Sequence, residues 1–177
     1  MIPARLLRCL LPVVYWLAMA TVSRTFTVSP PPSVIVDYLK DFAHAEQWDP
    51  GTQRCERVDT GPVTEGAYWH HVSKILGRTA ELTFTLDELT ERRVVFVGES
   101  GSTSAVDTIT VDPEGAGSVV TYEAELQMHG TARLLGPMVK VAFERLAGDT
   151  ERRLMVVLNG LLPVGSAQPG GVSVKGM

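Results

Sequence analysis

The stretch TAELTFTLDEL at residues 79–89 alternates between polar and apolar side chains over most of its length. A period of two is typical of a strand with one buried face, which predicts that Ala80, Leu82, Phe84 and Leu86 point inward. The segments around it have the same character and are separated by short turns rich in glycine and proline. Strands are therefore predicted at residues 53–60, 67–76, 93–100, 103–111 and 118–128 as well.

Further elements flank this block of strands on both sides. A first strand is predicted at 22–28, and the prolines that follow it lead into a predicted helix at about 31–42, with a short helical turn at 44–47. After the strands, a long amphipathic helix is predicted to begin at Gly136-Pro137 and to end near Asn159. Gly148 lies inside this helix and costs about 1 kcal/mol relative to alanine, which predicts either a break or a close approach there.

This order of elements predicts an α+β fold. We expect a curved antiparallel sheet of about seven strands, wrapped around a long C-terminal helix, with two short helices after the first strand. A helix laid across a strongly bent sheet leaves space beneath it that side chains do not fill. The sequence therefore predicts a cavity between the sheet and the last helix.

Composition narrows the class of protein. The chain has 177 residues, of which 45% are hydrophobic and 20% charged, as expected for one globular domain with a real core. A net charge of -4 without a cluster of Lys or Arg argues against nucleic-acid binding. The only cysteines are Cys9 and Cys55, so no disulfide framework is expected.

The two ends of the chain differ from the middle. Residues 1–20 have the basic start, apolar run and small-residue ending of a signal peptide, or they are an extension upstream of a true start at Met19. The apolar run is short and contains Pro12, so a stable membrane span is not expected. The domain is predicted at 21–159 and a flexible tail at 160–177. A start at Met19 implies a cytoplasmic protein, and a cleaved signal peptide implies a secreted one.

The chain resembles the helix-grip superfamily of START domains, Bet v 1 allergens and polyketide cyclases (SRPBCC), and in particular its polyketide cyclase/dehydrase subgroup of small bacterial proteins. The likeness runs from about Val22 to Leu158. Besides the order of elements, it rests on Asp37-Tyr38-Leu39-Lys40-Asp41-Phe42 leading to Trp48-Asp49-Pro50-Gly51, on Gly61-Pro62-Val63, and on Ala105-Val106-Asp107-Thr108-Ile109-Thr110. The resemblance implies a hydrophobic cavity for lipids, polyketides or similar molecules, including roles in lipid transport. It does not imply catalysis, since the superfamily mixes carriers, sensors and cyclases.

Asp107 and His71 are the candidates for chemistry. If Ala105 and Ile109 face inward, Asp107 shares their face, and desolvation raises its pKa toward a range suited to proton transfer. The alternative is that Asp107 lies at the rim or accepts backbone hydrogen bonds. His71 and His70 point to opposite faces of one strand, so they cannot bind one metal together, and His71 is preferred as the inward residue.

The predicted ligand-binding set contains apolar, aromatic and polar side chains, some of which are expected only to fill the core. Its members are Trp48, Trp69, His71, Leu82, Phe84, Phe96, Asp107, Tyr122, Met138 and Ala142. No metal-ligand motif, phosphate loop or nucleophile motif is present, so neither a metal nor another cofactor is expected.

Three functions follow from this reading. The leading hypothesis is a protein, monomeric or homodimeric, that binds a hydrophobic small molecule in the cavity without catalysing a reaction. The alternative is a cyclase or aromatase (or dehydratase) type of enzyme in which Asp107 and His71 move protons. A third is a module that binds a partner protein or a membrane surface, which would be marked by an exposed apolar patch.

Overall fold

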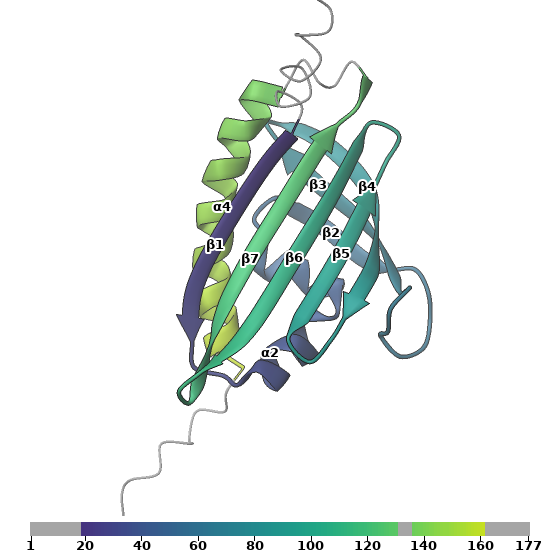
Figure 1. The fold of residues 1–177 in the computed structure, drawn as a ribbon. Helices are drawn as coiled ribbons and strands as arrows, with labels where there is room; N and C mark the ends of the chain where they lie inside the picture. Colours follow the sequence, from purple (N-terminus) through teal and green to yellow (C-terminus); the bar gives the residue numbers. More distant parts are fainter. Residues whose placement is uncertain (1–18, 131–135, 162–177) are drawn as a thin grey trace, which may run out of the picture.

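The computed structural model describes residues 19–130 and 136–161, which form one antiparallel sheet and the helices that cover its inner face (Figure 1). Seven strands lie in the order β1-β7-β6-β5-β4-β3-β2. This confirms the predicted α+β helix-grip fold. The elements are β1 (Met19–Val28), α2 (Pro32–Leu39), the 3-10 helix η1 (Phe42–His44), α3 (Ala45–Trp48), β2 (Thr52–Arg57), β3 (Tyr68–Ile75), β4 (Arg78–Leu89), β5 (Arg93–Glu99), β6 (Thr103–Glu114), β7 (Gly117–Met128) and α4 (Gly136–Asn159).

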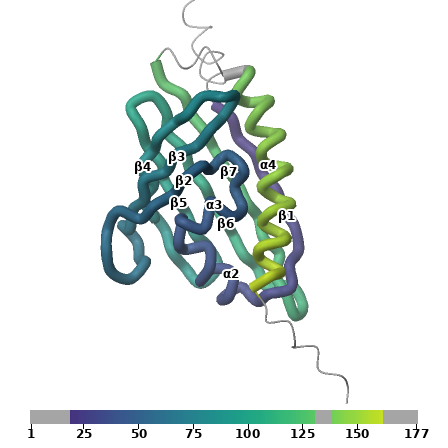
Figure 2. The backbone as a smooth tube through the Cα atoms, turned by 180° about the vertical axis from the view of Figure 1, so that it is seen from behind, coloured from purple at the N-terminus to yellow at the C-terminus, as the bar shows by residue number. Residues whose placement is uncertain are grey.

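The helices lie on one side of the sheet. Seen from behind, α4 runs alongside β1, and the segment with α2 and α3 lies over the middle of the sheet (Figure 2). α4 packs mainly against β1 and also contacts α3 and β3, while α3 packs against β2. The inner face is thus covered by α4 at the β1 end and by the short helices at the β2 end, and the space between these two covers is where a cavity can remain.

The inner face follows the predicted alternation. Leu82, Phe84 and Leu86 of β4 are buried, and the inward residues of β7 from Val120 onward are buried apart from the half-buried Leu126. Phe84 lies opposite Gly98 in the β4–β5 register. A Cβ atom on Gly98 would lie 2.5 Å from Cζ of Phe84, so this glycine provides the space that the ring occupies.

The helix predicted at 31–42 is present, but it ends three residues earlier than predicted. α2 ends at Leu39, and Asp41 is the N-cap of η1, where its carboxylate accepts a hydrogen bond from the Ala43 N–H at 3.1 Å. Asp41 Oδ1 also accepts a bond from Trp69 Nε1 at 3.0 Å. An aspartate that caps a new turn and holds a buried tryptophan ends the first helix earlier than the apolar spacing indicates. The short turn predicted at 44–47 is present as α3.

Three strand boundaries also differ from the predictions by three residues each, and one of them is the end of β2, which lies at Arg57 instead of residue 60. β1 begins at Met19, and Ala20 is buried and pairs with Leu126, so the folded part starts before residue 21. The turn predicted at Asp112–Gly115 belongs to β6 as far as Glu114, because the hairpin closes through two residues, Gly115 and Ala116. The rest of the predicted leader and tail, at 1–18 and 162–177, lies outside the described residues.

Gly148 neither breaks α4 nor marks a close approach. The helix is continuous from Gly136 to Asn159. A Cβ atom on Gly148 would meet only Nη1 of Arg152, at 3.9 Å, which is an ordinary contact. Tertiary packing on both sides of Gly148 keeps the helix intact in spite of its low propensity.

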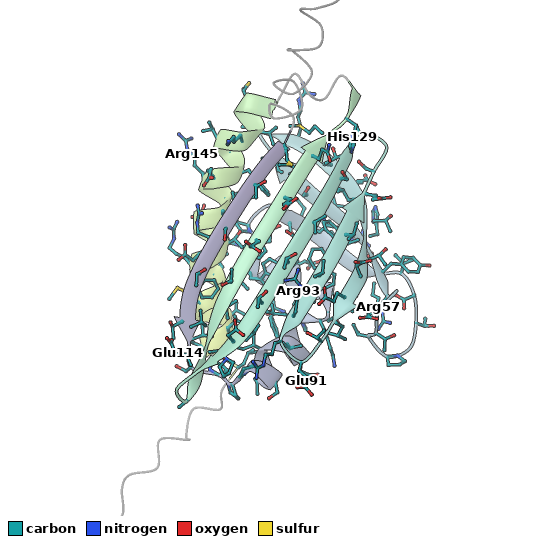
Figure 3. The ribbon with its side chains drawn as sticks, in the orientation of Figure 1. Arg57, Glu91, Arg93, Glu114, His129 and Arg145 are labelled. Carbon is teal, nitrogen blue, oxygen red and sulfur yellow. The ribbon has the colours of Figure 1, made fainter. Side chains whose placement is uncertain are left out.

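Charged side chains lie at the ends and edges of the sheet and on the outer side of α4, as Arg57, Glu91, Glu114 and Arg145 show (Figure 3). Across residues 19–130 and 136–161, no helix is long and apolar enough to cross a membrane. The charged side chains thus lie outside an interior in which the inner face of the sheet is mainly apolar.

Candidate functional site

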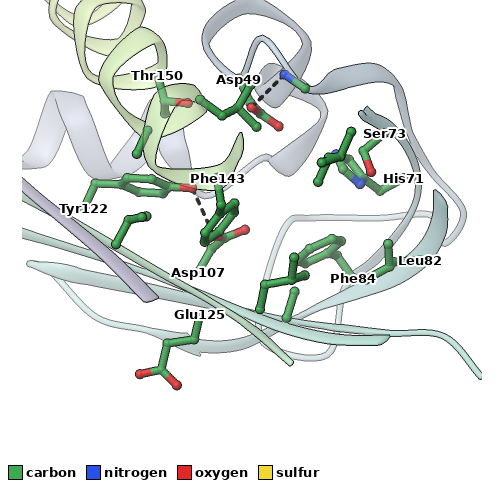
Figure 4. A pocket seen from close by; sticks show the side chains of 17 residues that line it. Asp49, His71, Ser73, Leu82, Phe84, Asp107, Tyr122, Glu125, Phe143 and Thr150 are labelled. Atoms are coloured by element: carbon green, nitrogen blue, oxygen red, sulfur yellow. Dashed lines mark hydrogen bonds between the residues drawn. The ribbon is translucent and has the colours of Figure 1, made fainter. Parts of the chain in front are cut away.

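A cavity lies between the inner face of the sheet and α4 (Figure 4). The centre of a water molecule can occupy about 70 Å³ of this cavity, which is several times the volume needed to hold one water. Glu125 borders the cavity, but its carboxylate points away from it (Figure 4). The other lining residues are Val22, Asp49, Gly51, His71, Ser73, Ile75, Leu82, Phe84, Ala105, Asp107, Tyr122, Leu126, Phe143, Leu146, Ala147 and Thr150.

Asp107 and Tyr122 form a hydrogen-bonded pair on the sheet wall of this cavity. They come from the neighbouring strands β6 and β7, and the Tyr122 hydroxyl donates to Asp107 Oδ1 at 3.1 Å. Burial, followed by the nearby charge of Asp49, raises the pKa of Asp107 to about 7, although the Tyr122 bond acts in the opposite direction. Burial, with the charge of Asp107, also raises the pKa of Tyr122 well above its usual value. Tyr122 is therefore a neutral donor, and Asp107 exchanges a proton near neutral pH.

Asp107 lies deep in the fold and yet keeps some exposed surface. The two facts agree because the exposed surface faces the cavity, into which water-sized molecules fit. A carboxyl group in this position is largely removed from bulk solvent but can still contact a small molecule. This is the environment in which a side chain can transfer a proton or orient a ligand.

A second set of polar side chains consists of His71 from β3, Thr52 at the start of β2 and Asp49 from the turn between α3 and β2. Thr52 Oγ1 lies 2.8 Å from His71 Nε2 and donates to Asp49 Oδ2 at 2.6 Å. The backbone N–H of Gly51 donates to the other oxygen of Asp49 at 3.0 Å. Burial lowers the pKa of His71, against the opposing effect of the Asp49 charge, so its imidazole is neutral at neutral pH.

An apolar groove continues the cavity toward the start of α4. Ser73, Ile75, Leu82 and Leu126 line both spaces. The centre of a water molecule can occupy about 340 Å³ of the groove. Met138 borders the groove with 62% of its surface exposed. The cavity and the groove together offer an inner polar end and an outer apolar end.

The predicted site residues divide into two groups. His71, Leu82, Phe84, Asp107 and Tyr122 all line the cavity, so the two candidates for chemistry face the same space. The other five do not line it. Met138 borders the groove, Ala142 lines neither space, and the rings of Trp48, Trp69 and Phe96 are buried in the core.

The prediction placed these three rings in the ligand-binding set, but a ring that faces the interior can belong to the packed core as well as to a cavity. Phe42 of η1 covers this part of the sheet and packs against Phe96 in a tilted arrangement, with ring centres 4.4 Å apart. Trp69 is held by its bond to Asp41. Trp48 packs edge-on against Tyr122, with ring centres 6.0 Å apart, and its Nε1 has no partner in the described part of the chain. These rings fill the space that the short helices cover.

Several lining residues were missed by the sequence reasoning. Asp49 and Thr52 lie between the predicted helical turn at 44–47 and the predicted strand at 53–60, and only the hydrogen bonds that link them to His71 place them at the site. On α4 the missed residues are Phe143, Leu146, Ala147 and Thr150. Thr150 is 2% exposed. It lies four residues after Leu146 and four before Leu154, so a threonine at this apolar spacing is the sequence signal that could have identified it.

Within residues 19–130 and 136–161, no group of three or more potential metal ligands comes together. Of the titratable side chains that point into the cavity, His71 and Tyr122 are neutral at neutral pH, and Asp107 gains or loses a proton near pH 7. Asp49 supplies a negative charge. Such an arrangement can orient a neutral ligand through hydrogen bonds and can exchange a proton with it.

A family model described as "Polyketide cyclase / dehydrase and lipid transport" matches residues 19–155. The chain belongs to this family. The match covers the whole sheet and most of α4, and it begins at the residue where β1 begins. No curated protein sequence matches the chain.

Solved structures with the same fold come from several groups of proteins. The Zhui aromatase/cyclase from Streptomyces sp. R1128 matches with a TM-score of 0.68 at 13% identity, over 84% of this chain and 98% of that one. Ginseng major latex-like protein 151 from Panax ginseng matches at 0.60 and 14%, over 82% and 99%. A START superfamily protein from Mycobacterium smegmatis matches at 0.57 and 20%, over 79% and 94%. At these identities the likeness shows the fold alone, whereas the family match confirms the predicted resemblance to the polyketide cyclase/dehydrase group.

Proposed function

We propose that this protein binds a hydrophobic small molecule, such as a lipid or a polyketide, in the cavity between the sheet and α4. The observation that carries the proposal is the buried Asp107–Tyr122 pair on the wall of a largely apolar cavity. The Tyr122 hydroxyl bonds Oδ1 of the Asp107 carboxyl group, so the second oxygen is available to orient a polar group of a ligand. The family description, which names lipid transport, supports the same proposal.

The groove gives the ligand its outer part. Its lining is mostly apolar, and it is continuous with the cavity through Leu82 and Leu126. A ligand with one polar group at Asp107 and an apolar extension toward Met138 would use both spaces. Because the inner cavity is small, we expect the polar end of the ligand to be compact.

Binding of the neutral fluorescent dye N-phenyl-1-naphthylamine tests this proposal. Ala147 lines the cavity and is buried, whereas Ala142, five residues earlier on the same helix, does not line it. We expect the wild type and Ala142→Leu to bind the dye and Ala147→Leu to bind at least ten-fold more weakly, because the added carbons occupy the cavity. Equal binding by all three, with circular dichroism confirming their folding, would place the dye elsewhere.

A second candidate is an enzyme of the cyclase or aromatase type, favoured by the fact that Asp107 and the neutral His71 face one cavity. In an aldol-like closure, His71 would accept a proton from a carbon beside a carbonyl group. That carbon would then attack a second carbonyl carbon, and protonated Asp107 would donate its proton to the alkoxide. Turnover of a multi-carbonyl substrate that falls as pH rises above about 7 would support this candidate. Full activity in Asp107→Asn would exclude it.

A further inference from the structure

The direction of the hydrogen bonds in the Asp49–Thr52–His71 chain follows from elementary donor counting. An ionised carboxylate only accepts, and Asp49 accepts from the Gly51 N–H on one oxygen and from the Thr52 hydroxyl on the other. Thr52 has a single hydroxyl proton, and the 2.6 Å bond to a carboxylate uses it. Thr52 Oγ1 can therefore only accept at its 2.8 Å contact with His71 Nε2.

This direction determines the tautomer of His71. A neutral imidazole carries one N–H and one lone pair, and the N–H must lie at Nε2 to donate to Thr52. The lone pair is then at Nδ1. The His71 side chain lines the cavity with only 5% of the residue exposed, and Nδ1 has no hydrogen-bond partner among the described residues.

We propose that Asp49 and Thr52 are positioning residues that hold His71 in the Nε2–H tautomer, so that Nδ1 accepts a hydrogen bond from a hydroxyl group of the ligand. A buried acceptor without a partner destabilises the empty site, and a ligand hydroxyl removes that cost. The ligand class is therefore an apolar molecule with an alcohol, enol or phenol group. The ligand part of this inference rests on the proposed binding function, whereas the tautomer part does not.

The tautomer can be read directly by NMR of protein labelled with 15N-histidine, at a pH where His71 is neutral. We expect the unprotonated nitrogen of His71 to be Nδ1, with the His71→Asn variant identifying its signals among those of the four histidines. In Asp49→Asn the chain should reverse. The Gly51 N–H keeps the amide oxygen on its side, so the amide NH₂ donates to Thr52, whose hydroxyl then donates to His71 Nε2.

The expected result is therefore that Asp49→Asn moves the His71 proton from Nε2 to Nδ1, while Asp87→Asn, an exposed control on β4, changes nothing. Thr52→Val should give a mixture of tautomers, and Thr52→Ser should restore the wild-type signals. A wild-type protein with its proton at Nδ1, or an Asp49→Asn protein with an unchanged tautomer, would overturn the assignment.

The ligand class is tested with phenol and toluene, which differ mainly in the hydroxyl group. Differences in hydration cancel when the ratio of their dissociation constants is compared between wild type and Asp49→Asn. We expect the preference for phenol to fall roughly five-fold in the variant, because Nδ1 then carries the proton and the phenol hydroxyl, a good donor but a poor acceptor, loses its donor bond. An unchanged ratio overturns the hydroxyl assignment alone. Failure of phenol, toluene and the neutral dye all to bind overturns the proposed function, whatever the tautomer.

Discussion

Replacing Asp107 by asparagine should remove a specific loss of stability that occurs as pH rises. In the folded protein the pKa of Asp107 is about 7, against a usual value of 3.8. Between these two pH values the folded state binds a proton that the unfolded state has lost, so the free energy of unfolding falls as pH increases. Asparagine has the same shape and does not titrate, so the variant lacks this loss.

The magnitude follows from the size of the shift. From pH 5 to pH 7 the unfolded carboxyl group is ionised and the folded one is mostly protonated, so each pH unit costs up to about 1.36 kcal/mol. The wild type should therefore lose up to about 2.7 kcal/mol relative to Asp107→Asn over that range. Water that enters the cavity screens the charge and reduces the figure.

Urea unfolding followed by tryptophan fluorescence at pH 5, 6, 7 and 8 measures this difference. His71 changes the free energy of unfolding in the opposite direction, because its lowered pKa destabilises the folded state as pH falls. The Asp49 carboxylate and the Tyr122 hydroxyl also act on Asp107. Subtracting the variant from the wild type isolates Asp107, and Asp112→Asn on the exposed end of β6 serves as the control. A difference between wild type and Asp107→Asn that does not change with pH would refute the reasoning.

Three further substitutions test the packing around the cavity by chemical denaturation. Gly148→Ala should stabilise the protein by about 0.5–1 kcal/mol, because a methyl group fits there without a clash, and a loss of stability would contradict this. Gly98→Ala should cost about 1–3 kcal/mol and weaken dye binding, since it displaces the ring of Phe84; unchanged binding would show that the ring is not needed there. Trp69→Phe should cost about 2 kcal/mol through the lost bond to Asp41, and a neutral effect would show that this bond does not stabilise the fold.

Much of the fold could be predicted because its signals are local. The alternation in residues 79–89 sets which face of β4 is buried, and the same rule placed Asp107 and Tyr122 on the inner side. Helix ends were predicted less well, because the end of α2 depends on Asp41, whose side chain has partners in η1 and β3. Such contacts join residues that are far apart in the sequence, and no local pattern contains them.

The site was predicted only in part for a related reason. Facing inward is a property of one strand, whereas lining a cavity depends on what lies on the opposite side. Trp69, Phe84 and Phe96 all face inward and pack against Phe42, but of the three only Phe84 also lines the cavity. Met138 was placed on the apolar stripe of α4, but only the fold shows that it borders the groove.

The central claim is that a small molecule occupies the cavity between the sheet and α4. Native mass spectrometry of the full chain purified from its own cells tests it most directly, with Ala147→Leu as the matched variant. We predict an added mass on the wild type that is released on denaturation and is absent from Ala147→Leu. A wild type at its bare mass that also takes up no neutral dye, or the same added mass on both proteins, would contradict the claim.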